Sequence, residues 1–114
     1  MAEYTLAHVG INGESEEEAR KAAQLLSTLF GFAVKEGKSS VCAGDVEGTK
    51  TPFKGTHGHI AIGTPDVAAA QAELEAKGFT FDPSTAKYLP DGTLNAIYLT
   101  GEIGGFAFHL VGKK

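Results

Sequence analysis

The stretch Gly58-His59-Ile60-Ala61-Ile62-Gly63-Thr64-Pro65-Asp66 decides the fold, because it repeats a pattern that begins near the N-terminus with His8-Val9-Gly10-Ile11. Each segment places a histidine at the start of an apolar, strand-like run and leads through a polar turn into a helical pattern. The first helical pattern ends at Gly31-Phe32 and the second at Gly78-Phe79. The chain is therefore predicted to contain two copies of one unit.

The first unit predicts a strand, a helix and three strands. A strand is expected over residues 4–11, and Ser15-Glu16-Glu17-Glu18 is a capping box that starts a helix. Gly31 ends this helix after Phe30, because glycine adopts the left-handed closing conformation most easily. Short strands are expected over residues 32–34, 39–43 and 46–50. The apolar stripe of the helix consists of Ala19, Ala22, Ala23, Leu26, Leu29 and Phe30.

The second unit follows the same order. Residues 58–62 predict a strand, Thr64-Pro65-Asp66 predicts a helix start with proline in the first turn, and Gly78 ends the helix. A turn is expected at Asp82-Pro83, and Lys87 fits either a strand or a loop. The remaining strands are expected over residues 79–81, 94–99 and 106–111.

Each unit is too small to cover both faces of its own sheet. Two units are therefore expected to stack into one α+β domain with the helices outside, with module one at about 1–54 and module two at about 55–114. The length of 114 residues and the hydrophobic content of 42% agree with a single domain over residues 1–114.

Charge and composition exclude several classes of protein. The net charge of −4 and the scattered lysines argue against a nucleic-acid partner. No apolar run approaches the roughly 20 residues that cross a bilayer, and residues 1–4 do not resemble a signal peptide. Neither a membrane partner nor export is expected, so a cytoplasmic location is predicted. The single cysteine, Cys42, excludes an internal disulfide and is predicted to be a small buried residue.

Strand periodicity gives three histidines a common side. Side chains alternate along a strand, so His8, His59 and His109 are each expected on the face opposite to their bulky apolar neighbours. Small residues beside the histidines leave room for a cavity. Three neutral imidazoles in such a cavity can bind a divalent ion and leave a position open for water or substrate. Zinc is the expected metal, with nickel, manganese or cobalt as alternatives.

Each histidine taken alone also fits a hydrogen-bonded core or strand-end residue. The shared parity and the repeat favour metal binding over that interpretation. His57 differs, because it lies two residues before His59 at the entrance of a strand. There a solvent-facing role, or contact with a metal ligand, fits better than direct ligation.

These motifs resemble the vicinal oxygen chelate superfamily, which includes glyoxalases, methylmalonyl-CoA epimerase, bleomycin-resistance proteins and extradiol dioxygenases. The resemblance covers nearly the whole chain and rests on the segments at His8 and His59 with their helices, and on the closing run over residues 104–110. It implies paired βαβββ modules that form an open, cupped mixed sheet around a divalent metal, which chelates neighbouring oxygens of a small-molecule substrate. It also implies a homodimer.

The resemblance further implies a ligand set. His8 matches the metal ligand on the first strand of module one, and His59 matches the ligand on the first strand of module two. His109 stands where the superfamily most often has glutamate, which makes oxygen-activating chemistry less expected. A fourth ligand normally comes from the last strand of module one, where Glu47 is the nearest carboxylate and Asp45 is a weaker candidate. The other interpretation of Glu47 is a solvated turn residue.

A closer likeness is to small domains of this superfamily that are associated with bacterial 2-keto-3-deoxy-6-phosphogluconate aldolases, carried by residues 55–64, 96–99 and 102–105. Aldolase chemistry itself is not expected, because 114 residues cannot form the barrel of such an enzyme.

Three hypotheses for function follow. The first is a metal-dependent lyase or isomerase of the glyoxalase type that acts on a small oxygenated metabolite, with Glu47 or His57 as the proton carrier. The second is a non-catalytic domain that binds or sequesters a small molecule. The third is a structural dimerisation module, which predicts a cavity filled by phenylalanine and leucine side chains.

Overall fold

One mixed sheet of eight strands and two helices make up the computed structural model, which describes residues 2–112. In chain order the elements are β1 (Thr5–Asn12), α1 (Glu16–Phe30), β2 (Val34–Glu36), β3 (Ser40–Ala43), β4 (Val46–Thr49), β5 (Gly58–Thr64), α2 (Val67–Ala76), β6 (Phe81–Tyr88), β7 (Leu94–Leu99) and β8 (Phe106–Gly112). The strands lie in the order β2-β3-β4-β1-β5-β8-β7-β6. This arrangement confirms the predicted α+β class and the repeated order of elements.

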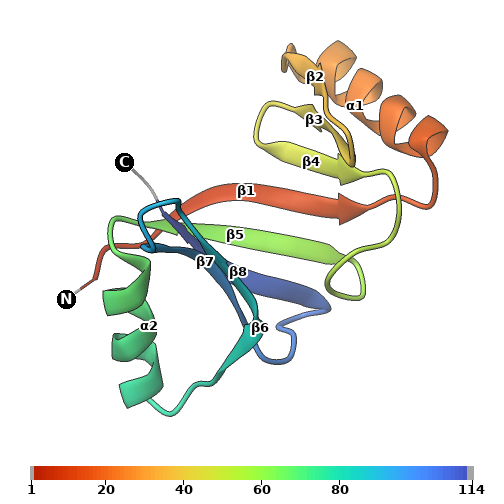
Figure 1. Cartoon of the computed structure of the whole chain (residues 1–114). Helices are drawn as coiled ribbons and strands as arrows, with labels where there is room; N and C mark the ends of the chain where they lie inside the picture. The colour runs from red at the N-terminus through yellow and green to blue at the C-terminus, as the bar shows by residue number, and fades with distance from the viewer. Residues whose placement is uncertain (1, 113–114) are drawn as a thin grey trace.

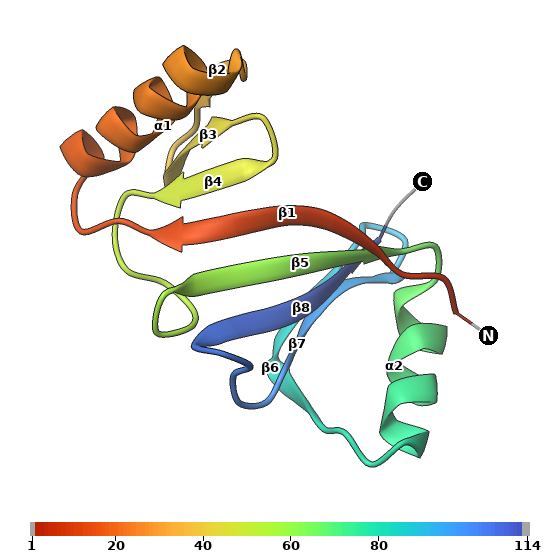
Figure 2. The same ribbon diagram turned by 180° about the vertical axis from the view of Figure 1, so that it is seen from behind.

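The two units join edge to edge through their first strands. β1 pairs antiparallel with β5, while β1 runs parallel to β4 and β5 runs parallel to β8. The sheet curves, with α1 beside the strands of the first unit and α2 beside those of the second (Figure 1). The view from behind shows the helices at opposite ends of the molecule (Figure 2). The strands β4, β1, β5 and β8 therefore form the middle of the sheet.

Helix α1 begins and ends where the sequence predicts. Ser15 caps its N-terminus by accepting a hydrogen bond from the backbone N–H of Glu18 at 3.1 Å. Gly31 closes its C-terminus with a left-handed φ of 74°, which glycine adopts without a steric penalty. The predicted stripe is only partly correct, because Leu29 and Phe30 are exposed. The neighbouring strand β2 has three residues and offers little surface to cover this end of the helix.

Helix α2 begins later than predicted. Asp66 is its N-cap, and its side chain accepts the backbone N–H of Ala69 at 3.1 Å. Pro65 therefore precedes the helix instead of lying in its first turn. The side chain of Asp66 satisfies a free N–H of the first turn, so the helix starts after Asp66. Neither helix in the described part of the chain is long and apolar enough to span a membrane.

Strand β6 contains residues that were predicted to form a turn. Asp82 and Pro83 lie inside this strand, whose register with β7 is irregular between Asp82 and Lys87. β6 is an edge strand, where a proline without an N–H removes no hydrogen bond of the sheet. The side chain of Asp82 accepts the backbone N–H of Ser84 at 3.0 Å and so satisfies the backbone locally.

Candidate metal centre

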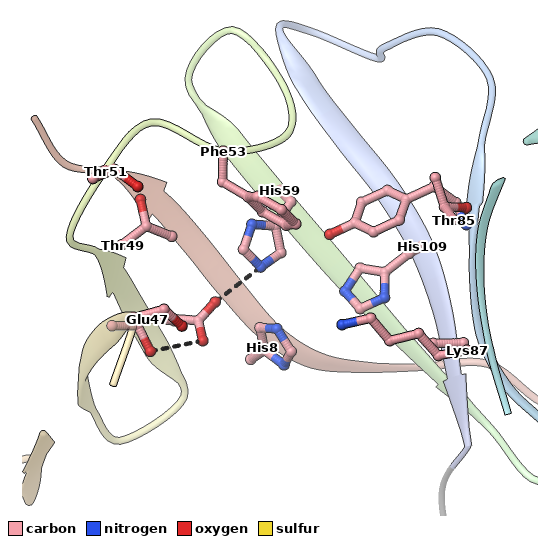
Figure 3. Close-up of a pocket in the computed structure, with 13 residues that line it drawn as sticks. His8, Glu47, Thr49, Thr51, Phe53, His59, Thr85, Lys87 and His109 are labelled. Atoms are coloured by element: carbon pink, nitrogen blue, oxygen red, sulfur yellow. Dashed lines mark hydrogen bonds and ion pairs between the residues drawn. The ribbon is translucent and has the colours of Figure 1, made fainter. Parts of the chain in front are cut away.

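Each of the four middle strands brings one histidine or glutamate to the same cavity. Glu47 stands on β4, His8 on β1, His59 on β5 and His109 on β8, and all four line the cavity. Figure 3 shows these side chains facing one another. Leu110, the neighbour of His109, packs against α2 on the opposite face of the sheet. The predicted strand parity of the histidines therefore agrees with the structure.

The register of the strands explains why these side chains meet. In each module one of them lies on the first strand and the other lies on the last strand, which pairs with the first strand, and each is opposite a small residue. The paired residues are Gly10 with His59 and His8 with Ala61 across β1 and β5, Gly10 with Glu47 across β1 and β4, and Ala61 with His109 across β5 and β8. Exchange of the two modules thus maps His8 onto His59 and Glu47 onto His109. Glu47 is a strand residue at a position equivalent to His109, and not a residue of a turn.

The three histidines form a tight set of nitrogens. One ring nitrogen from each of His8, His59 and His109 lies within 4.8 Å of the other two. Imidazole nitrogens gathered at this spacing are candidate ligands for one divalent ion. Glu47 contacts this set from one side, since its Oε1 lies 3.0 Å from Nε2 of His59. Its Oε2 accepts a hydrogen bond from Oγ of Ser40 at 3.1 Å.

The buried nitrogens of the cluster are short of hydrogen-bond partners. His59 is 3% exposed and His109 is 8% exposed. Within residues 2–112, Nδ1 of His59 and both ring nitrogens of His109 make no hydrogen bond. Buried polar atoms are normally paired, because an unpaired one costs about 1–3 kcal/mol. Coordination would satisfy these nitrogens, so the residues fit the ion that the sequence predicts.

Burial favours the neutral form of the imidazoles, which is the form that binds metals. It lowers the pKa of His8 below its usual value. It also lowers the pKa of His109 to about 4, and the neighbouring His59 adds to this effect. The hydrogen bond with His59 lowers the pKa of Glu47. At neutral pH the site therefore presents neutral His8 and His109 beside an ionised Glu47.

Two close contacts fix the orientation of the rings. A Cβ atom on Gly10 would lie 2.1 Å from Cε1 of His59, so only glycine leaves room for that ring over β1. The ring of Tyr98 stacks on His109, with centroids 4.5 Å apart and an angle of 21° between the planes. Burial raises the pKa of Tyr98 to about 12, which keeps the phenol protonated. Sequence reasoning missed Tyr98, although its alternation with the buried Ile97 placed it on the histidine side of β7.

The cavity around the histidines measures about 370 Å³ and is rich in hydroxyl groups. Among residues 2–112, the lining includes no leucine and a single phenylalanine, Phe53, so the cavity is not filled in the way that a purely structural module requires. The other lining residues are Ser39, Ser40, Thr49, Thr51, Thr85, Lys87, Ala96 and Tyr98.

Two of the predicted site residues lie outside this cavity. His57 is exposed, and its ring packs near Phe106 with a centroid distance of 5.8 Å. Gly58, with a φ of 154°, interrupts the extended backbone, so the parity of β5 does not extend back to His57. Asp45 is exposed in the turn between β3 and β4 and acts on His8 only through its charge.

Solved structures resemble this chain, whereas sequence comparisons find no relative. No protein-family model matches the sequence, and no curated protein sequence matches it. Among solved structures, a methylmalonyl-CoA epimerase in complex with methylmalonyl-CoA and NH4+ superposes with a TM-score of 0.66 at 18% identity, covering 95% of this chain and 93% of the other. The chain has the glyoxalase-like fold.

Two further structures share the glyoxalase-like fold with this chain. A hypothetical protein from Bacillus halodurans C-125 has a TM-score of 0.66 at 15% identity, with 97% of this chain and 95% of the other covered. Methylmalonyl-CoA epimerase from Mycobacterium tuberculosis has a TM-score of 0.64 at 14% identity, with 96% and 87% covered. Identities this low establish the architecture, and the chemistry must be argued from the side chains of this chain.

Proposed function

We propose that the protein is a metal-dependent isomerase or lyase of the glyoxalase-like type that acts on a small oxygenated metabolite. The observation that carries this proposal is the convergence of His8, His59 and His109, one nitrogen of each within 4.8 Å of the others, on a cavity of about 370 Å³. A cavity of this volume suits a small metabolite. The methylmalonyl-CoA epimerases of the same fold are isomerases, which supports the reaction class.

The three histidines are proposed to hold the ion, with zinc expected first and nickel, manganese or cobalt as alternatives. When bound, such an ion supplies Lewis-acid polarisation of ligand oxygens. Glu47 is proposed as the proton carrier, or as a fourth ligand. Among residues 2–112 it is the only carboxylate that lines the cavity. His57, the other predicted proton carrier, does not line it, so the proposal assigns proton transfer to Glu47.

One observation favours the second hypothesis, a non-catalytic binding domain. The carboxylate of Glu47 is already engaged by His59 and by Ser40, and no second carboxylate from the described residues lines the cavity. If Glu47 acts only as a ligand or as a partner of His59, the described cavity contains no carboxylate base. The same cavity would then bind or sequester a small molecule without turning it over.

Turnover with and without metal separates these two functions. The zinc-loaded protein would be assayed against methylmalonyl-CoA, related acyl-CoA thioesters and a panel of 2-oxoaldehydes, with exchange of solvent deuterium into the substrate as the readout. Loss of exchange in Glu47→Gln with retained zinc binding would establish the enzyme. Binding of a panel member by calorimetry without exchange in the parent would establish the binding domain.

Three expectations from the sequence remain predictions. They are the homodimer, the cytoplasmic location, and the likeness to domains associated with 2-keto-3-deoxy-6-phosphogluconate aldolases. Sedimentation of the purified protein would decide the oligomeric state.

A further inference from the structure

Lys87 is a charged group in the cavity wall that the histidine site does not use. It is the only lysine or arginine among the residues that line the cavity. In Figure 3 its ammonium group points toward His8 and His109. Within residues 2–112, no carboxylate lies within ion-pair distance of its Nζ, whereas the buried Lys50 pairs with Glu36 at 3.0 Å. The cavity wall thus presents an exposed ammonium group with no ion-pair partner among the described residues, in a chain of net charge −4.

The irregular register of β6 places Lys87 over the cavity. The pairing with β7 shifts between Asp82 and Lys87 and again after Lys87, and Lys87 then lies opposite Ala96. Opposed residues of an antiparallel pair share a face, so Lys87 shares the cavity face with Ala96 and Tyr98. The small side chain of Ala96 leaves room for the stem of the lysine. Irregularities of this kind re-aim a side chain beside a functional site.

The surroundings of Lys87 suit a carboxylate better than a phosphate. Phosphate groups in proteins are typically held at helix N-termini or by several cationic side chains. Both helices of the described chain pack against the opposite face of the sheet, through Ala19 and Ala23 of α1 and Val67 and Ala70 of α2. A single ammonium group beside hydroxyl groups provides one charged partner, which matches a carboxylate. Because Glu47 is engaged by His59 and Ser40, it leaves Lys87 available.

We propose that the cavity takes a small 2-hydroxy or 2-oxo carboxylic acid, or a larger ligand ending in that group, whose carboxylate is bound by Lys87. The neighbouring hydroxyl or oxo oxygen then lies against the histidine cluster. This inference rests on the proposed function for the site and names the class of its substrate.

Calorimetric titration with matched pairs of ligands tests this inference. The pairs are glycolate and glycolamide, lactate and lactamide, and glycerate and glyceramide, which differ in the carboxylate alone. Each would be titrated into the zinc-loaded parent, into Lys87→Met and into Lys54→Met. Lys54 is the matched control. Its Nζ lies 5.6 Å from the ring centroid of Tyr98, but Lys54 does not line the cavity. Lys54→Met therefore removes the same charge near the cavity without changing the cavity wall.

The parent is expected to prefer at least one acid over its amide by about 10-fold or more, the usual worth of a hydrogen bond to a charged group. Lys87→Met should lose this preference, and Lys54→Met should keep it. Lys87→Gln replaces Lys87→Met if the latter fails to fold. The inference is overturned if no acid binds better than its amide, if Lys87→Met keeps the preference, or if Lys54→Met loses it equally.

Zinc titration of the parent keeps this test separate from the proposed function. If zinc binds and the acids and amides bind alike, the substrate class is wrong and the metal site stands. If zinc does not bind and the acid preference still depends on Lys87, the metal-dependent function is wrong and the carboxylate pocket stands.

Discussion

The two modules share one topology and differ in how firmly they hold their half of the site. Module two has a core of larger side chains, formed by Val67, Ala70, Phe81, Ile97 and Leu110, whereas the core of module one consists of Ala19, Ala23, Val41 and Ala43. The site residues follow the same trend. His59 and His109 are buried, while His8 and Glu47 are partly exposed. Module two therefore holds its half of the cluster in a more fully buried setting than module one does.

The largest effect is expected from truncation of the core in module two. Leu110→Ala removes a side chain that is 2% exposed and should lower the free energy of unfolding by about 2–5 kcal/mol. Leu29→Ala in module one removes an exposed leucine and should change the free energy of unfolding by no more than about 0.5 kcal/mol. Urea unfolding in excess chelator measures both without a contribution from metal. Equal effects of the two substitutions would remove the distinction between the modules.

Removal of a buried histidine should abolish most of the metal affinity. His59→Ala and His109→Ala are each expected to weaken zinc binding by at least about 100-fold, the upper range for loss of a residue that merely supports a ligand. Both variants should remain folded in chelator, since the removed rings face the cavity and not the helices. His57→Ala is the control and should bind zinc as the parent does. Competition against a chromophoric chelator measures the affinities, and zinc binding by His109→Ala at the affinity of the parent would mark His109 as a core residue.

Exchange of the small residues between the modules should give smaller effects. The substitution in module one should change zinc affinity, and the one in module two should mainly change stability. Gly10→Ala places a methyl group 2.1 Å from Cε1 of His59, so it must displace that ring and should weaken zinc binding by about 10- to 100-fold. Ala61→Gly, at the equivalent position of module two, should leave zinc affinity within about 3-fold and reduce stability by about 0.5–1 kcal/mol. If Gly10→Ala binds zinc normally, the position of His59 over β1 does not matter for the site.

The smallest effect is expected from pH. The pKa of His109 falls from 6.5 in the unfolded chain to about 4 in the folded protein, so between these values the unfolded chain binds more protons. The metal-free protein should therefore lose stability as pH falls below 6.5, by about 1 kcal/mol over the first pH unit. His109→Leu should lose this part of the pH dependence. A parent whose stability in chelator is constant over this interval would contradict the burial of a neutral His109.

Local patterns predicted the fold and the common face of three of the four residues of the cluster. The strand 94–99 was predicted with the bounds that β7 has, and the parity of His8, His59 and His109 follows from alternation within single strands. Glu47 stayed open between strand and turn, because its place depends on pairing with β1 and β3. Lys87 was missed as a site residue, because an irregular register with another strand sets its direction. Contacts that depend on pairing between distant segments are not encoded in the local periodicity of one segment.

The metal content of the purified protein tests most directly whether His8, His59 and His109 form a metal centre. The parent and the triple variant His8→Ala, His59→Ala, His109→Ala would be purified without chelator and without nickel affinity resin, dialysed against zinc, freed of loose metal and analysed by mass spectrometry for bound elements. Close to one divalent ion per chain is expected in the parent, and almost none is expected in the triple variant. A parent without bound metal, or a triple variant that retains as much metal as the parent, would contradict the proposal that these histidines form a metal centre.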